Sequence, residues 1–185
     1  MTQTSNGQFG RLAAGAAFGF MAGLALPHAR KAVMQGPSIA AGDWAEALKT
    51  EHRMVEKAFQ ALLATDASDH MKRQMLLTKI AYALTKHAIE EENVLYPALA
   101  ENGREELAHH LIEDHGQVKT FIYDLRRTAL DDPSWIETVR TFFTALQQHV
   151  REEEEEVFPA FHQALSGDEN ARLTRMLNWE GFKVA

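Results

Sequence analysis

The sequence predicts an all-α protein, an antiparallel up-down-up-down four-helix bundle with an N-terminal apolar leader segment. Three observations predict it. Apolar residues recur at helical spacing over long stretches after Asp43, no run alternates as a strand would, and short polar loops separate the helical stretches. Four helices of about 20 to 30 residues with short connections are typical of such a bundle. We expect a leader and linker over 1–42, the bundle over 43–165 and a short helical tail over 166–185.

The leader contains an uncharged run, LAAGAAFGFMAGLAL, over residues 12–26. It is short for a membrane-spanning helix, which needs about 20 residues, and its surroundings make a poor signal peptide. Gly15, Gly19 and Gly23 fall on one helical face, where small residues let two helices approach closely. Two interpretations stay open: membrane contact or self-association through residues 12–26, or a low-complexity leader that packs on the bundle or stays mobile. Residues 35–43 are expected to be a linker.

The elements of the bundle follow from cap residues, prolines and turns. Asp43 is a candidate N-cap for the first helix, and Pro133 suits the first turn of the fourth, where a missing N–H costs nothing. Pro97 and Pro159 are expected to kink or end the second and fourth helices. The helices are therefore predicted over 43–64, 70–96, 104–130 and 133–158, with a short terminal helix after 166–168.

One polar helical segment occurs twice. HAIEEENVLYP begins at His87 and HVREEEEEVFP begins at His149, so their matching positions are 62 residues apart. A second pair, EHRMV at Glu51 and DHGQV at Asp114, is separated by 63 residues. The first two helices therefore resemble the last two, and two copies of one helical hairpin, related by a pseudo-twofold axis, would build the bundle.

The repeat places polar residues on the apolar stripes of all four helices. A histidine and a glutamate four residues apart share one helical face, so they turn toward the core together. Burying such groups without partners costs several kcal/mol per charge, and a pair of divalent cations would compensate. Glutamates could bridge the two ions, with neutral imidazoles completing the coordination. The candidate ligands are His52, His87, Glu91, His115, His149 and Glu153.

Neighbouring residues are weaker candidates. Glu90 and Glu152, three residues after the repeated histidines, are the alternative carboxylates. Tyr96 either packs under Pro97, which we prefer, or donates a hydrogen bond near the metals. The other repeated acids, Glu92 and Glu154–Glu156, are interpreted as a solvated acidic face. His109 and His110 do not share the helical face of the histidine at 115.

The ordered pattern of His, His-x-x-x-Glu, His and His-x-x-x-Glu resembles the hemerythrin-like (HHE) domain over about residues 43–165. The resemblance implies a non-heme di-iron centre in a four-helix bundle, with manganese as the other candidate metal. It implies dioxygen, peroxide or nitric oxide as ligand, and redox or peroxide-handling activity. Oxygen-carrying hemerythrins have a fifth histidine, where this chain has Leu111 or Lys119, so reversible oxygen carriage is less expected. An iron- or oxygen-responsive sensor and a metal-free structural bundle are the alternatives, so whether the chain is an enzyme stays open.

Composition excludes several other functions. The net charge is −7 and the pI is near 5.7, so no nucleic-acid partner is expected. The absence of cysteine excludes disulfides, thiolate metal sites and a cysteine nucleophile. No phosphate-binding or dinucleotide-binding motif is present.

The expected location is the cytoplasm, with membrane association through the N-terminal segment as an open alternative.

Overall fold

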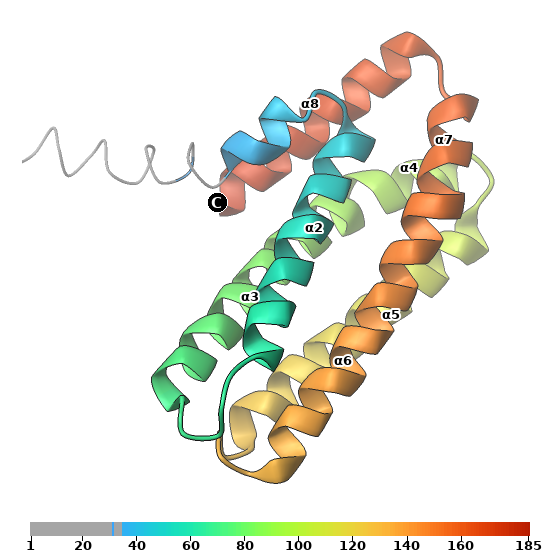
Figure 1. Ribbon diagram of the computed structural model, residues 1–185. Helices are drawn as coiled ribbons and strands as arrows, with labels where there is room; N and C mark the ends of the chain where they lie inside the picture. The colour runs from blue at the N-terminus through green and yellow to red at the C-terminus, as the bar shows by residue number, and fades with distance from the viewer. Residues whose placement is uncertain (1–30, 32–34) are drawn as a thin grey trace, which may run out of the picture.

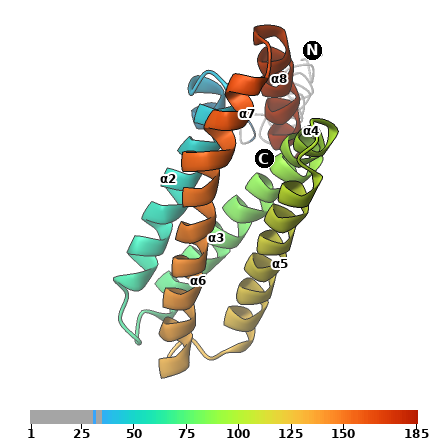
Figure 2. The same cartoon turned by 90° about the vertical axis from the view of Figure 1, so that its right-hand side faces the viewer.

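The computed structural model describes residue 31 and residues 35–185, and the apolar run at 12–26 lies outside these residues. The described chain is helical with no strand, which confirms the all-α prediction (Figure 1). Its four long helices are α2 (Trp44–Leu63), α3 (His70–Glu90), α5 (Glu105–Arg127) and α6 (Pro133–Glu152). α2 packs against α3 and α6, and α5 packs against the same two helices, so the four surround one core (Figure 2).

Local sequence sets the starts of the helices. The Asp43 carboxylate accepts a hydrogen bond from the Glu46 N–H and caps α2 as predicted. Asp132 accepts from the Ser134 N–H, and Pro133 occupies the first position of α6. Ser166 forms a capping box with Glu169 at the start of α8 (Gly167–Val184).

Two π-helical turns follow α3 and α6. Glu91–Leu95 precedes α4 (Tyr96–Glu101), and Glu153–Val157 precedes α7 (Phe158–Ala164). The chain thus stays helical through Pro97 and Pro159 rather than ending there. A proline lacks the N–H for an α-helical hydrogen bond, and its ring crowds the preceding turn. A π turn is wider than an α-helical turn, so it leaves room for the proline ring. Both π turns begin at a candidate metal ligand.

The hydrophobic core consists of two clusters. One, toward the α2–α3 and α5–α6 loops, includes Phe59, Ile80 and Phe142, and the other, toward α4 and α7, includes Trp44 and Phe161. Along each long helix the polar repeat residues lie between the segments that form the two clusters. The candidate site is therefore a polar layer inside the bundle, with apolar packing on both sides.

Two elements beyond the repeat pack on the bundle. Residues 35–40 form a helix, so the expectation of a linker over 35–43 is wrong for them. α8 has 18 residues and packs along α3 and α2, so the tail is longer than the short helix predicted. A Cβ atom at Gly181 would lie only 1.7 Å from Glu90 Oε1, so only glycine lets α8 pack this close to the Glu90 carboxylate.

Among the residues that the structure describes, no helix is both long and apolar enough to cross a membrane.

Candidate metal centre

The six candidate ligands come together in the polar layer, and each is at most 5 % exposed. α2 and α5 each contribute one histidine, while the ends of α3 and α6 each contribute a histidine and the glutamate that opens the following π turn. The i, i+4 spacing puts each histidine and its glutamate on one face. The converging residues are His52, His87, Glu91, His115, His149 and Glu153.

The Nε2 atoms of all four histidines face the centre. His87 Nε2 lies 3.1 Å from Glu91 Oε2, and His115 Nε2 lies 3.3 Å from the same oxygen. The Nε2 atoms of His52 and His149 each lie 3.4 Å from Glu153 Oε2. Each glutamate therefore lies between histidines of both hairpins, which is the arrangement a bridging carboxylate needs.

The Nδ1 atom of each histidine meets a second carboxylate on the outer side. The pairs are His52 with Glu154 at 2.8 Å, His87 with Glu51 at 3.2 Å, His115 with Glu92 at 3.1 Å and His149 with Asp114 at 3.2 Å. A carboxylate at Nδ1 holds the proton there, which leaves Nε2 free as a metal ligand and fixes the ring.

These four outer acids were missed from the sequence. The interpretation as a solvated acidic face is wrong for Glu92 and Glu154, because each is only partly exposed and contacts an imidazole of the other hairpin. The repeat carried the signal: an acid precedes His52 and His115, and an acid follows Glu91 and Glu153. An acid that precedes a histidine contacts Nδ1 of the other histidine in its own hairpin. An acid that follows a glutamate contacts Nδ1 of a histidine in the other hairpin.

Tyr96 does more than pack under Pro97. Its hydroxyl donates to Glu153 Oε1 at 2.8 Å and lies 3.2 Å from Glu91 Oε2 and 3.3 Å from His115 Nε2. The preference for a packing role is therefore wrong, since this buried residue also contributes its hydroxyl. The equivalent residue of the second hairpin is Phe158, so only one half of the centre has this donor.

Several buried atoms of the centre lack a hydrogen-bond partner, namely Glu91 Oε1, Glu153 Oε2 and His149 Nε2. Buried acceptors without a partner are costly unless a water or an ion satisfies them. The potential ligands form two overlapping groups, His52, His87, Glu91 and Glu153 on one side and Glu91, His115 and His149 on the other. This N/O donor set fits divalent transition metals.

Burial and mutual charge distort the protonation of the metal-free centre. Burial alone would lower the pKa of His52, but Glu153 and Glu154 outweigh it and raise that pKa to about 10. Burial lowers the pKa of His87 to about 4, although Glu51 opposes the shift. Burial and the negative charge of Glu153 raise the pKa of Glu91 well above its ordinary value. The raised pKa values of His52 and Glu91 favour protons at the place where a cation would bind.

The weaker candidates lie outside this centre. Glu90 turns toward Lys86, and the half-buried Glu152 lies near the exposed His110. At the positions considered for a fifth histidine, Leu111 is buried in the apolar cluster near α4 and α7. Lys119 is exposed, and its Nζ lies 3.0 Å from Glu92 Oε1.

A small cavity of about 70 Å³ reaches the centre between α3 and α5. Its wall is mostly apolar, with Ala88, Val118 and Ile122 among the lining residues, and His115 forms part of it. Glu92 and Lys119 also line it, so the ion pair behind His115 borders the cavity. One water needs about 10–15 Å³ of such volume, so the space has room for a ligand of several heavy atoms.

Comparison with known proteins agrees with this geometry. The sequence model of the hemerythrin HHE cation-binding domain matches residues 44–161. The chain belongs to the hemerythrin HHE family. The crystal structure of an HHE cation-binding domain-containing protein from Mycobacterium kansasii superposes with a TM-score of 0.68 at 22 % identity, covering 77 % of this chain and 86 % of that one. This likeness supports the HHE fold.

A curated relative is a protein named DNA nickase from Nostoc sp. (strain PCC 7120). It is 27 % identical to the HHE chain over 138 residues, which is 75 % of this chain. The match spans 39 % of the length of that relative.

Proposed function

We propose that this HHE chain is a non-heme di-iron protein that binds dioxygen, peroxide, nitric oxide or a related small ligand and has redox or peroxide-handling activity. Manganese is the other candidate metal, because N/O ligands suit both ions. His52 and His87 would hold one ion and His115 and His149 the other, within an antiparallel four-helix bundle. Glu91 and Glu153 would bridge the pair.

One observation carries this proposal: the four Nε2 atoms converge on two carboxylates while each Nδ1 atom meets an outer acid. Histidines that only stabilise a fold have no need of this repeated arrangement, whereas metal-binding histidines do. One buried oxygen of Glu91 and one of Glu153 have no hydrogen-bond partner, and bound cations would compensate for this loss.

A bound iron pair would supply redox chemistry and an exchangeable coordination position for a small ligand. The chain provides the surroundings. The apolar wall with Val118 limits the size of what reaches His115, and the Tyr96 hydroxyl holds a proton beside both bridging carboxylates. A fifth imidazole is missing at Leu111 and Lys119, so we favour ligand turnover over reversible oxygen carriage.

Metal analysis and absorption spectroscopy test this proposal. The purified protein should contain two iron ions per chain, and azide should change the near-ultraviolet and visible absorption of its oxidised form. Catalytic peroxide consumption would then separate peroxide handling from ligand binding alone. A chain that binds neither iron nor manganese would contradict the proposal and favour a structural bundle.

A sensor is the second candidate function, because the helix at 35–40, which lies outside the repeat, contacts the polar layer. Ser38, from the helix at 35–40, donates to Glu51, the outer acid of His87. A change at the metal centre could therefore alter how this helix packs. Loss of a bound protein partner on iron removal would favour the sensor over the enzyme.

We also propose a cytoplasmic protein whose residues 12–26 contact a membrane or a second copy of the chain. The support is the uncharged Gly/Ala-rich composition of that run. Vesicle co-sedimentation and the oligomeric state, with and without residues 1–30, test the two alternatives.

A further inference from the structure

The two hairpins of the repeat serve as controls for each other, because their surroundings differ. The outer acid of His87, Glu51, has a side chain 6 % exposed, whereas its equivalent in the second hairpin, Asp114, is 23 % exposed. Glu90 is fully buried, while its equivalent, Glu152, is 28 % exposed. The residues that cover the first hairpin come from the helix at 35–40 and from α8.

Ser38 reaches the centre through one carboxylate. Its hydroxyl donates to Glu51 Oε1 at 2.5 Å, and the other oxygen of that carboxylate lies 3.2 Å from His87 Nδ1. Both Ser38 and Glu51 are almost completely buried. A single acid therefore connects the appended helix to a candidate metal ligand, with no water-exposed step between them.

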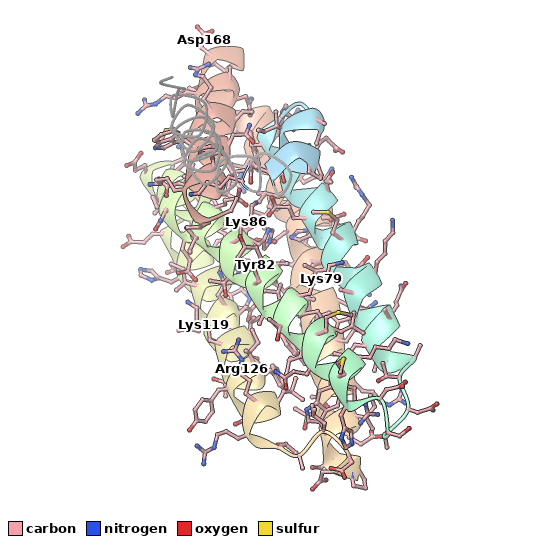
Figure 3. All side chains as sticks on the ribbon, turned by 90° about the vertical axis from the view of Figure 1, so that its left-hand side faces the viewer. Lys79, Tyr82, Lys86, Lys119, Arg126 and Asp168 are labelled. Carbon is pink, nitrogen blue, oxygen red and sulfur yellow. The ribbon has the colours of Figure 1, made fainter. Side chains whose placement is uncertain are left out.

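A buried lysine completes the connection. Lys86 Nζ donates to Glu51 Oε1 at 2.5 Å and to Glu90 Oε1 at 2.8 Å. Gln35 Nε2 lies 3.2 Å from the same oxygen of Glu90 and 3.3 Å from Asn178 Oδ1 on α8. Figure 3 shows Lys86 on α3 close to the end of α8. The second hairpin has the exposed Gln148 in place of Lys86, so this network exists in one half only.

We propose that Ser38 is a positioning residue for His87, and that docking of the helix at 35–40 and metal binding in the His87 half favour each other. The inference rests on the proposed metal function and adds a part of the chain outside the repeat to it. Two donors, Ser38 and Lys86, fix Glu51 Oε1, so Oε2 stays in place to hold the Nδ1 proton of His87. Coupling of two binding events is reciprocal, so the metal also stabilises the docked helix.

Metal release tests the first direction. Iron-loaded wild type, Ser38→Ala and Ser38→Thr are mixed with excess chelator, and release is followed by absorption. Ser38→Ala should release one of its two ions about tenfold faster, the size of effect that loss of an outer-shell partner has, while the other ion is released as in wild type. Ser38→Thr retains the hydroxyl and should keep the wild-type rates.

Ser134→Ala is the matched control. Ser134 also donates to a carboxylate, that of Asp132 at 2.7 Å, but at the exposed start of α6. The Ser134→Ala variant should therefore release both ions at the wild-type rates. Equal release from wild type and Ser38→Ala, or acceleration of both ions by Ser134→Ala as well, would overturn the inference while leaving the metal function intact.

Hydrogen exchange in wild-type protein tests the reverse direction without any substitution. The backbone amides of residues 38–41 should exchange faster after iron removal, whereas those of the 65–69 loop, at the far end of the bundle, should be unchanged. Identical exchange at 38–41 with and without iron would overturn the coupling. A wild-type chain that holds no metal would overturn the proposed function and this inference with it.

Discussion

Tyr96 and Glu153 join the two hairpins through a hydrogen bond of 2.8 Å between the tyrosine hydroxyl and Oε1 of the carboxylate. The same hydroxyl lies 3.2 Å from Glu91, so one neutral donor serves both candidate bridging acids. Burial and the negative charges of Glu153 and Glu91 raise the pKa of Tyr96 well above its ordinary value, so the hydroxyl keeps its proton. Phe158, the equivalent residue of the second hairpin, has no hydroxyl, so the two halves of the centre are chemically unequal.

Replacing Tyr96 by phenylalanine should destabilise the metal-free protein. The ring fits, but two buried carboxylates lose their shared donor, so we expect the free energy of unfolding to fall by about 1.5–3 kcal/mol. Urea denaturation with chelator present measures it. Tyr123→Phe is the control, since Tyr123 is 59 % exposed, and its effect should be small. Equal stability of Tyr96→Phe and wild type would contradict the role of the hydroxyl.

Glu153→Ala should abolish binding of at least one metal ion, whereas Glu152→Ala should retain two. The buried Glu153 Oε2 lies 3.4 Å from the Nε2 atoms of both His52 and His149, whereas Glu152 lies near the exposed His110. Because metal stabilises the folded state by mass action, chelator should lower the thermal midpoint of wild type and Glu152→Ala much more than that of Glu153→Ala. Similar metal contents in the two variants would contradict the assignment.

Metal binding near pH 7.5 should release protons. His52, with its pKa raised to about 10, carries a proton in the protein without metal and must lose it to act as a ligand. The raised pKa of Glu91 acts in the same direction, whereas His87, with a pKa of about 4, is already neutral. Affinity should therefore rise with pH from neutrality toward about pH 10. Calorimetry in buffers of different ionisation enthalpy counts the protons, and a count of zero would contradict this protonation scheme.

Val118→Trp should slow the binding of azide to the oxidised protein. Val118 lines the cavity beside His115, and an indole ring would fill much of its roughly 70 Å³. Stopped-flow absorption measures the association rate, and Val118→Ala, which widens the same wall, should bind azide at least as fast as wild type. An unchanged rate in Val118→Trp, with iron content intact, would show that the ligand reaches the metals by another route.

Gly181→Ala should destabilise the protein, whereas Gly116→Ala should not. A Cβ at Gly181 would lie 1.7 Å from Glu90 Oε1 and force α8 and the glutamate apart, at a cost of about 1–3 kcal/mol. Gly116, in the middle of α5, has free space around its Cβ position, and alanine there should stabilise the helix by up to about 1 kcal/mol. Thermal denaturation measures both, and a neutral Gly181→Ala would mean that α8 packs more loosely than its contacts indicate.

The sequence predicted the helices and the inward residues because both depend on local periodicity. His87 and Glu91 share a face at four-residue spacing whatever the rest of the fold does. The same reasoning failed at Glu92 and Glu154, because an acid on the flank of a helix looks solvated until the neighbouring helix is in place. Only the tertiary arrangement brings Glu154 to His52 and Glu92 to His115.

Irregular and appended elements were harder to predict for a different reason. A linker was expected around Pro37 because glycine, proline and serine there match a turn composition, yet Gln35 and Ser38 make buried hydrogen bonds that favour a helix. The prolines at 97 and 159 indicated a kink or an end of the helix, whereas the chain stays helical through both, with a π turn before each proline. Long-range partners decided both outcomes, and a single sequence does not contain their positions.

The paired π turns also bear on the order of two steps in the evolution of the chain, an insertion and a duplication. Relative to a regular α-helix, a π turn contains one inserted residue, and the turns at Glu91–Leu95 and Glu153–Val157 occupy equivalent places 62 residues apart. The simplest history has one insertion in an ancestral hairpin, followed by duplication of the gene segment. Deleting Asn93 and Glu155, equivalent exposed residues, would reverse that insertion. A helix turns by about 100° per residue, so Tyr96 should then leave the centre and iron binding should fall. Retention of both ions would show that the insertion came without functional consequence.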